Sequence, residues 1–136
     1  MTGETNLSKL IAGMDPIVNE GEYVFVSVSN YNGIHSGDVI CGFREKEGTT
    51  LIIKRDKAIE LGLSFEFVAS WITLQIHSAL DAVGLTAAFS GELAKFGISC
   101  NVVAGYYHDH IFVDQKDTKK TVKTLKRLAK RHKNGT

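Results

Sequence analysis

The residues best suited to bind a small charged ligand lie in the stretch 77–88, whose sequence is His-Ser-Ala-Leu-Asp-Ala-Val-Gly-Leu-Thr-Ala-Ala. This stretch leads from the end of a predicted strand into a predicted helix, where first-turn N–H groups lack intrahelical acceptors and attract a carboxylate or phosphate. Gly84 lets the backbone approach a ligand closely, and Asp81 is placed to accept hydrogen bonds from an ammonium group. Together these groups complement an α-amino acid zwitterion. The pattern also fits an ordinary strand-to-helix loop in which Thr86 or Asp81 caps the helix.

A second cluster, His108-Asp109-His110, could supply metal ligands. Other histidines could complete such a site, namely His35, His77 and His132. Zinc sites need three or four ligands at defined spacing, and nothing in the sequence fixes the remaining ones. We therefore favour a polar hairpin tip with a structural histidine, and we expect neither a metal nor another cofactor.

No arrangement of residues points to catalysis. The chain contains no G-x-G-x-x-G and no G-x-x-x-x-G-K-[ST] phosphate-binding motif, and no motif pairs its carboxylates as general acid and base. Cys41 and Cys100 lie in apolar runs without neighbouring groups that would lower a thiol pKa. One disulfide is formally possible, but small buried thiols in a reduced cytoplasmic protein are the favoured interpretation. The protein is predicted not to be an enzyme.

Composition limits the class of protein further. The chain has 136 residues, of which 43% are hydrophobic, and a formal net charge of +1. This size suits one globular domain, or two small ones sharing a core, and the composition excludes intrinsic disorder. No apolar run approaches the roughly 20 residues that span a bilayer, and the first twenty residues do not resemble a secretory signal. We expect a cytoplasmic protein that does not bind membranes.

Charge is distributed unevenly, with net +7 over residues 114–136 and −6 over residues 1–113. The basic end is predicted to form an amphipathic helix over 118–131 with an apolar stripe that includes Val122, Leu125 and Leu128. One face then packs on a sheet and the lysines are solvated, so we do not expect nucleic-acid binding. The basic end could instead meet an anionic partner or the acidic body of a second copy, and composition does not choose between these.

The hydrophobic periodicity predicts alternating helices and strands. Helices are expected over 7–14, 55–61, 85–96 and 118–131, and strands over 23–29, 39–43, 50–53, 65–76, 100–107 and 111–113. Asn6 or Thr5 is expected to cap the first helix, and residues 108–109 to form a tight turn. The two halves follow the same plan, except that the loop 30–38 stands where the second half has the helix 85–96. A βαββα order implies an antiparallel sheet with helices on one face.

The stretches 78–89 and 93–113 resemble the ACT-domain family. The recurring features are a helix that ends in Gly97-Ile98 before a strand, and a hairpin that ends in Asp109-His110-Ile111-Phe112-Val113. More closely, the chain resembles small stand-alone proteins with two ACT-like units, similar to the regulatory region of aspartokinase. The resemblance covers 65–131 well and 15–64 more loosely, and the segment 43–50 also fits that group.

This resemblance implies an α+β, ferredoxin-like (βαββαβ-type) ACT fold with units at 1–64 and 65–136, the first of them degenerate because it lacks its first helix. It also implies edge-to-edge pairing of ACT units, a homodimer or higher homo-oligomer, and an amino-acid effector at the unit–unit interface. The implied ligand contacts come from the loop before the first helix and from the start of the second strand: Asp81, Val83, Gly84, Leu85, Thr86, Ile98 and Asn101.

The leading hypothesis is therefore a non-enzymatic regulatory module that binds an amino acid. The alternative is an ACT-like structural or interaction protein that acts by dimerisation, or by docking to an enzyme or transporter, without a ligand. A third hypothesis, a metal-dependent enzyme built on the turn His108–His110, would require stoichiometric metal.

Overall fold

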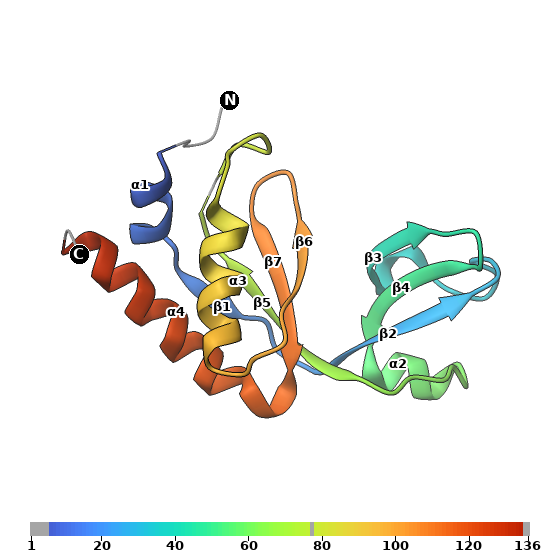
Figure 1. Cartoon of the computed structure of the whole chain (residues 1–136). Helices are drawn as coiled ribbons and strands as arrows, with labels where there is room; N and C mark the ends of the chain where they lie inside the picture. Colours follow the sequence, from blue (N-terminus) through green and yellow to red (C-terminus); the bar gives the residue numbers. More distant parts are fainter. Residues whose placement is uncertain (1–5, 77, 135–136) are drawn as a thin grey trace. The chain divides into compact units, whose positions relative to one another are not determined.

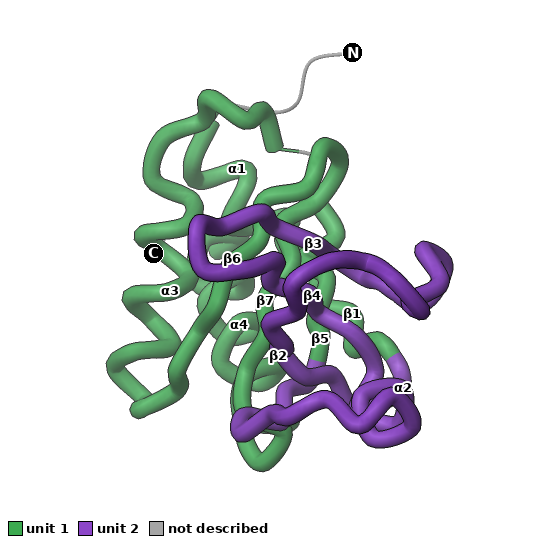
Figure 2. Tube along the Cα trace, turned by 90° about the vertical axis from the view of Figure 1, so that its right-hand side faces the viewer, with its two compact units in different colours: residues 1–19, 71–136 green, residues 20–70 purple. Residues whose placement is uncertain are grey.

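The structure, a computed structural model, describes residues 6–76 and 78–134. These residues form two compact units, shown in two colours in Figure 2. Unit 1 takes the described residues up to Asn19 together with those from Trp71 onwards, and unit 2 takes Glu20–Ser70. In the described part of the chain, none of the helices combines the length and hydrophobicity that crossing a bilayer requires.

Unit 1 has the ferredoxin-like arrangement (Figure 1). Its elements are α1 (Leu7–Ala12), β1 (Pro16–Val18), the end of β5 (Val68–Leu74), α3 (Leu85–Lys95), β6 (Asn101–Ala104), β7 (Asp109–Asp114), a 3-10 turn (Gln115–Asp117) and α4 (Thr118–Lys133). The strand order is β1-β5-β7-β6, with β1 antiparallel to β5 and β6 antiparallel to β7. Taken from β5, the unit is β-α-β-β-α, and β1 from the N-terminal end of the chain supplies its last strand.

Local sequence accounts for the ends of these helices. The Asn6 side chain accepts a hydrogen bond from the Lys9 N–H at 3.1 Å, which confirms the predicted cap of α1. Gly97 follows the end of α3 with φ +72°, a left-handed conformation that glycine adopts without a Cβ penalty.

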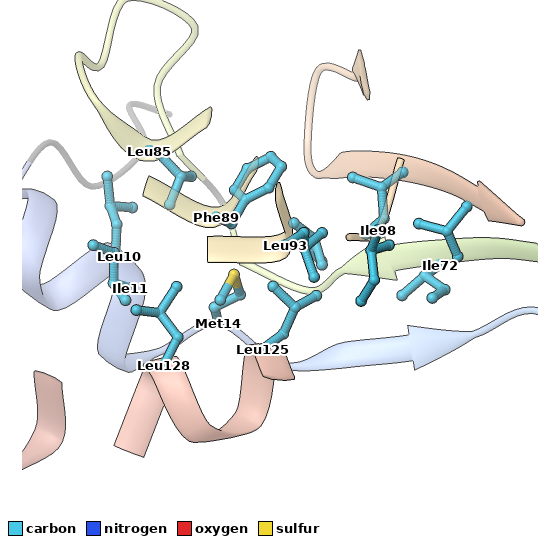
Figure 3. Close-up of a cluster of buried hydrophobic side chains, with 13 residues drawn as sticks. Leu10, Ile11, Met14, Ile72, Leu85, Phe89, Leu93, Ile98, Leu125 and Leu128 are labelled. Carbon is cyan, nitrogen blue, oxygen red and sulfur yellow. The ribbon is translucent and has the colours of Figure 1, made fainter. Parts of the chain in front are cut away.

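The core of unit 1 lies between its sheet and the helices α1, α3 and α4 (Figure 3). Side chains from all three helices meet those of β5 and β7 there, and Leu10, Phe89, Leu93 and Leu125 are fully buried. The apolar stripe predicted for α4 is confirmed, since Leu125 and Leu128 belong to this core and Val122 packs against it.

Unit 2 has the same strand order, but among the described residues it contains the single helix α2 where unit 1 contains α1, α3 and α4. It contains β2 (Tyr23–Val28), a 3-10 turn (Ser36–Asp38), β3 (Val39–Arg44), β4 (Thr49–Lys54), α2 (Arg55–Glu60) and the start of β5. Its strands are antiparallel in the order β3-β4-β2-β5, and its core is a small cluster made by Val24, Val26, Leu51, Ile53 and Ala58. The predicted loop 30–38 is confirmed in outline, because residues 29–35 form no helix or strand.

Three details of the sequence prediction are wrong. The strand β1 was not expected, because a three-residue strand that begins with proline has no hydrophobic alternation to reveal it. The strand predicted over 65–76 is limited to Val68–Leu74. The strand predicted over 100–107 covers only Asn101–Ala104, and the turn predicted at 108–109 spans 105–108, where the Gly105 N–H donates to the His108 carbonyl at 2.9 Å before β7 begins at Asp109.

Two sequence predictions fall on residues outside the described ones, namely a cap at Thr5 and the use of His77 as a further metal ligand. The division into units at 1–64 and 65–136 remains a prediction about repeated sequence units. The compact units group residues by contact, and β5 contributes its start to one and its end to the other.

Candidate ligand-binding site

The loop between β5 and α3 brings the first group of predicted site residues together. The Ala82 N–H donates to the Ala79 carbonyl at 3.0 Å and closes a turn that contains Asp81. Gly84 then takes the N-cap position of α3 with φ +99°, and its carbonyl accepts from the Ala88 N–H at 2.9 Å. The left-handed φ explains glycine here, because other residues adopt it only with strain.

The start of α3 has no side-chain cap. Gly84 offers no acceptor, and the first turn of α3 contains no acidic residue. Neither Asp81 nor Thr86 caps the helix, so the ordinary capping arrangement considered from the sequence is absent at this helix start. The first-turn N–H groups can therefore donate to an acceptor that is not a capping side chain. The helix dipole favours an anionic acceptor at this position.

Exposure divides the loop residues into two kinds. Val83 is 85% exposed, and Asp81 and Thr86 are also exposed. Leu85 is 3% exposed and its side chain packs in the core, so only its backbone is available to a ligand at the start of α3. The Leu7 side chain lies against Gly84, since a Cβ added to that glycine would stand 3.1 Å from Leu7 Cδ2.

Ile98 and Asn101 lie elsewhere in unit 1. The Ile98 side chain is in the core and its N–H donates to the Leu93 carbonyl at 3.0 Å. Asn101 pairs with Phe112 on the neighbouring strand, and the Phe112 ring stacks on Trp71. Trp71 is the residue at which β5 enters unit 1. The loop with Asp81 and Gly84 follows the other end of β5. A single unit 1 therefore does not bring the two groups of predicted site residues together.

The histidine cluster at the hairpin has a hydrogen-bonding role. Trp71 Nε1–H donates to His110 Nδ1 at 3.0 Å, and Thr73 Oγ1 lies 3.1 Å from the same nitrogen. Burial lowers the pKa of His110, and the neighbouring His108 lowers it further. Within residues 6–76 and 78–134, no three His, Cys, Asp or Glu side chains gather in a way that could hold a metal ion.

The cysteine thiols have no sign of activation. Both are free and half-buried, and burial raises the pKa of Cys100 to about 11. A thiol with a raised pKa is protonated at neutral pH and is a poor nucleophile.

Sequence reasoning missed one buried charged group, Glu92 on α3. Its carboxylate is 6% exposed and accepts from Arg131 of α4 at 3.0 Å, while Lys95 lies 3.5 Å away. Arg131 holds the pKa of Glu92 below its ordinary value. The signal was present in the sequence, because Glu92 follows Phe89 by three residues and so lies on the apolar side of the helix. Its role is to join α3 to α4.

Hollows occur elsewhere in both units. In unit 1, a trough of about 540 Å³ lies between the segment that joins α1 to β1 and one side of α4. In unit 2, one hollow of about 350 Å³ borders the loop after β2, and another of about 440 Å³ borders α2.

Comparison with protein families gives two matches. One ACT-domain model matches residues 2–70, and a second ACT-domain model matches residues 66–127. ACT domains are generally small-molecule regulatory modules. A search of curated proteins finds no match.

Solved structures give further matches. A protein of unknown function from Vibrio cholerae, described as a possible transport protein, is 44% identical with a TM-score of 0.81, over 90% of this chain and 95% of that one. A protein from Agrobacterium tumefaciens is 20% identical with a TM-score of 0.70, over 85% and 89% of the two chains. The ligand-free regulatory subunit of aspartate kinase from Thermus thermophilus is 8% identical with a TM-score of 0.56, over 83% and 95%. The last two matches concern the fold alone.

Proposed function

Since the chain belongs to the ACT-domain family, we propose that it is a regulatory module that binds an α-amino acid in unit 1. The proposed module is cytoplasmic and has no catalytic activity of its own. The single observation that carries the proposal is the uncapped first turn of α3 behind the left-handed Gly84. Its N–H groups suit the carboxylate of the ligand, and the exposed Asp81 in the preceding turn suits the ammonium group.

The predicted contacts at Ile98 and Asn101 require a second copy of the chain in this proposal. Asn101 is exposed and uses its amide nitrogen to donate to the Phe112 carbonyl at 3.2 Å, so its side-chain oxygen is the group available for a ligand. Ile98 has its side chain in the core and would contribute backbone only. A homodimer that places this strand start beside the loop of the partner would complete the site.

Thermal unfolding in the presence of each common amino acid tests the proposal, because a ligand that binds only the folded state raises the melting temperature by mass action. We expect one or a few amino acids to raise it at millimolar concentration. Asp81→Asn should remove the shift and leave the unliganded melting temperature unchanged, since Asp81 is exposed. Asp56→Asn, which changes an exposed aspartate of unit 2, is the matched control and should keep the shift.

Absence of a shift with every amino acid would refute the ligand-binding proposal. A shift that survives Asp81→Asn would exclude Asp81 from the site. Sedimentation of the protein with and without the effective amino acid tests the homodimer separately, and a monomer in both conditions would refute that part.

A second candidate function is docking to another protein without a ligand. It is favoured by the apolar exposure of the same loop, where Leu80 is 70% and Val83 is 85% exposed. Under this alternative, Leu80→Ser/Val83→Ser weakens self-association or partner binding, while no amino acid changes the melting temperature.

A further inference from the structure

The helix α4 carries cationic side chains on two flanks, and the first flank is used within unit 1. Lys120 Nζ donates to the Phe96 carbonyl at 2.6 Å, and the Arg127 guanidinium lies 5.9 Å from the centre of the Phe96 ring. Arg131 pairs with the buried Glu92 at 3.0 Å. Every cation on this flank therefore contacts α3 or the residue that follows it.

The second flank, which we call the lysine flank, has no such partners. Its members follow one another at intervals of four and three residues, which places them on one side of the helix: Lys119, Lys123, Lys126, Lys130 and Lys133. All five are exposed, and within residues 6–76 and 78–134 none of them takes part in an ion pair. Five like charges spread over about 21 Å of helix repel one another, and an anionic partner would reduce this repulsion.

The lysine flank borders the trough of unit 1. Lys126, Lys130 and Lys133 line one side of this hollow of about 540 Å³, and Ala129 lies between them. The other side is the segment Ala12–Asp15, which joins α1 to β1 (Figure 1). That side offers acceptors, namely the Asp15 carboxylate and the end of a helix, where backbone carbonyls outnumber donors.

The two sides of the trough together indicate which kind of molecule would bind there. The phosphates of a nucleic acid would suit the lysines but are themselves acceptors only, and a net charge of +1 gives little long-range attraction to such a polyanion. A flat bilayer does not enter a trough, and the apolar stripe of α4 is already buried in the core. A peptide supplies both anionic side chains and backbone N–H donors.

We propose that the lysine flank and its trough form a docking surface for an acidic peptide segment of another protein. Lysine rather than arginine suits this role, because ammonium groups on flexible stems attract carboxylates without demanding one bidentate geometry. The surface includes none of the residues of the proposed amino-acid site, so the two proposals stand or fall separately.

Fluorescence anisotropy of the full chain with a labelled peptide of alternating glutamate and serine tests this proposal. We expect binding that weakens as NaCl rises from about 50 mM to about 300 mM, because exposed charges are screened. The same peptide with glutamine in place of glutamate should not bind.

Charge-matched variants locate the surface. Lys126→Gln/Lys130→Gln/Lys133→Gln should weaken binding about tenfold and fold normally, since it removes like-charge repulsion from an exposed helix side. The control Lys9→Gln/Arg44→Gln/Lys46→Gln removes the same number of exposed charges elsewhere and should weaken it less than about twofold.

Three outcomes would overturn the proposal. The first is no binding of the acidic peptide at millimolar concentration. The second is equal weakening by both triple variants, which would mean diffuse attraction by net charge. The third is tighter binding of oligothymidylate or of phosphatidylserine vesicles than of the peptide, which would assign the lysine flank to phosphates.

Discussion

The two units share one strand order but differ in one connection, which joins β5 to β6 in unit 1 and β2 to β3 in unit 2. Unit 1 uses the eleven-residue helix α3, and α3 supplies Leu85, Phe89 and Leu93 to a large core. Unit 2 uses the loop 29–35 and a short 3-10 turn, and the residues buried in its cluster are few. The comparison indicates that the sheet topology tolerates either connection, while a helix in this place adds to the apolar surface that the unit buries.

The largest expected effect comes from removing a core side chain in each unit. Phe89→Ala in unit 1 should lower the free energy of unfolding by about 3–5 kcal/mol. Leu51→Ala in unit 2 should lower it by about 2–3 kcal/mol, because the smaller cluster can collapse around the lost atoms. Urea unfolding followed by far-UV circular dichroism gives both values, and an equal or larger loss for Leu51→Ala would contradict the comparison.

The next effect concerns the ion pairs of the two units. Glu92→Gln removes a carboxylate that is 6% exposed and hydrogen-bonded to Arg131, so we expect a loss of about 1–2 kcal/mol, reduced by screening of the exposed cations. The control Glu22→Gln breaks an exposed pair with Arg55 in unit 2 and should cost less than about 1 kcal/mol.

The Glu92→Gln variant is also expected to show a pH-dependent effect on stability. Because the folded-state pKa of Glu92 lies below its ordinary value of 4.5, its stabilisation is present above that pH and is lost as pH falls through the folded-state pKa. The difference between wild type and Glu92→Gln should therefore shrink in acid, as measured by urea unfolding at several pH values.

A smaller effect distinguishes two left-handed glycines. Gly62→Ala after α2 of unit 2 meets no atom within 4 Å, so only backbone strain of about 1 kcal/mol is expected. Gly84→Ala in unit 1 adds a contact of 3.1 Å with Leu7 and should cost more. Adding Leu7→Ala to Gly84→Ala should remove the excess in a double-mutant cycle, and an excess that remains would show that Leu7 is not its cause.

The smallest effect is spectroscopic and belongs to unit 1. Trp71, the only tryptophan, donates to His110, whose pKa lies below its ordinary value of 6.5 because of burial. The neutral form therefore stabilises the fold above that pH, and this contribution is lost as pH falls through the folded-state pKa.

We expect Trp71 fluorescence to change with pH, with a midpoint below pH 6.5. Two neighbouring groups also act on the pKa of His110, which His108 lowers and Asp109 raises. His110→Gln should abolish the change, and His35→Gln in unit 2 should keep it. A midpoint at or above 6.5 would contradict the assigned burial.

Most of the fold was predictable because its signals are local. The helices over 7–14, 85–96 and 118–131 show their apolar spacing and end signals within one stretch, and the hairpin around 45–48 is bounded by two apolar runs. The short strand β1 was not predictable, since its pairing with β5 depends on residues far away in the sequence. Its proline and length hide it further.

The candidate site was predictable only as far as its backbone. The start of the helix at 85 suggested open N–H groups, and the structure shows no side-chain cap there, whereas the left-handed conformation of Gly84 was not predicted. The burial of Leu85 and Ile98 was not predictable, because an apolar residue beside a loop fits either a core or a ligand contact. The ion pair of Glu92 depends on how α3 and α4 cross, which periodicity does not specify.

The pairing of β1 with β5 places residues 20–70 between two paired strands of unit 1. The Asn19 N–H donates to the Trp71 carbonyl at 2.9 Å, so the chain leaves one antiparallel strand and re-enters the other at directly opposed residues. Such a pair is the geometry that a two-residue Asn-Gly turn closes in a β-hairpin. Residues 20–70 thus lie, along the sequence, where a hairpin turn would lie, and unit 1 completes its sheet only with the chain on both sides of them.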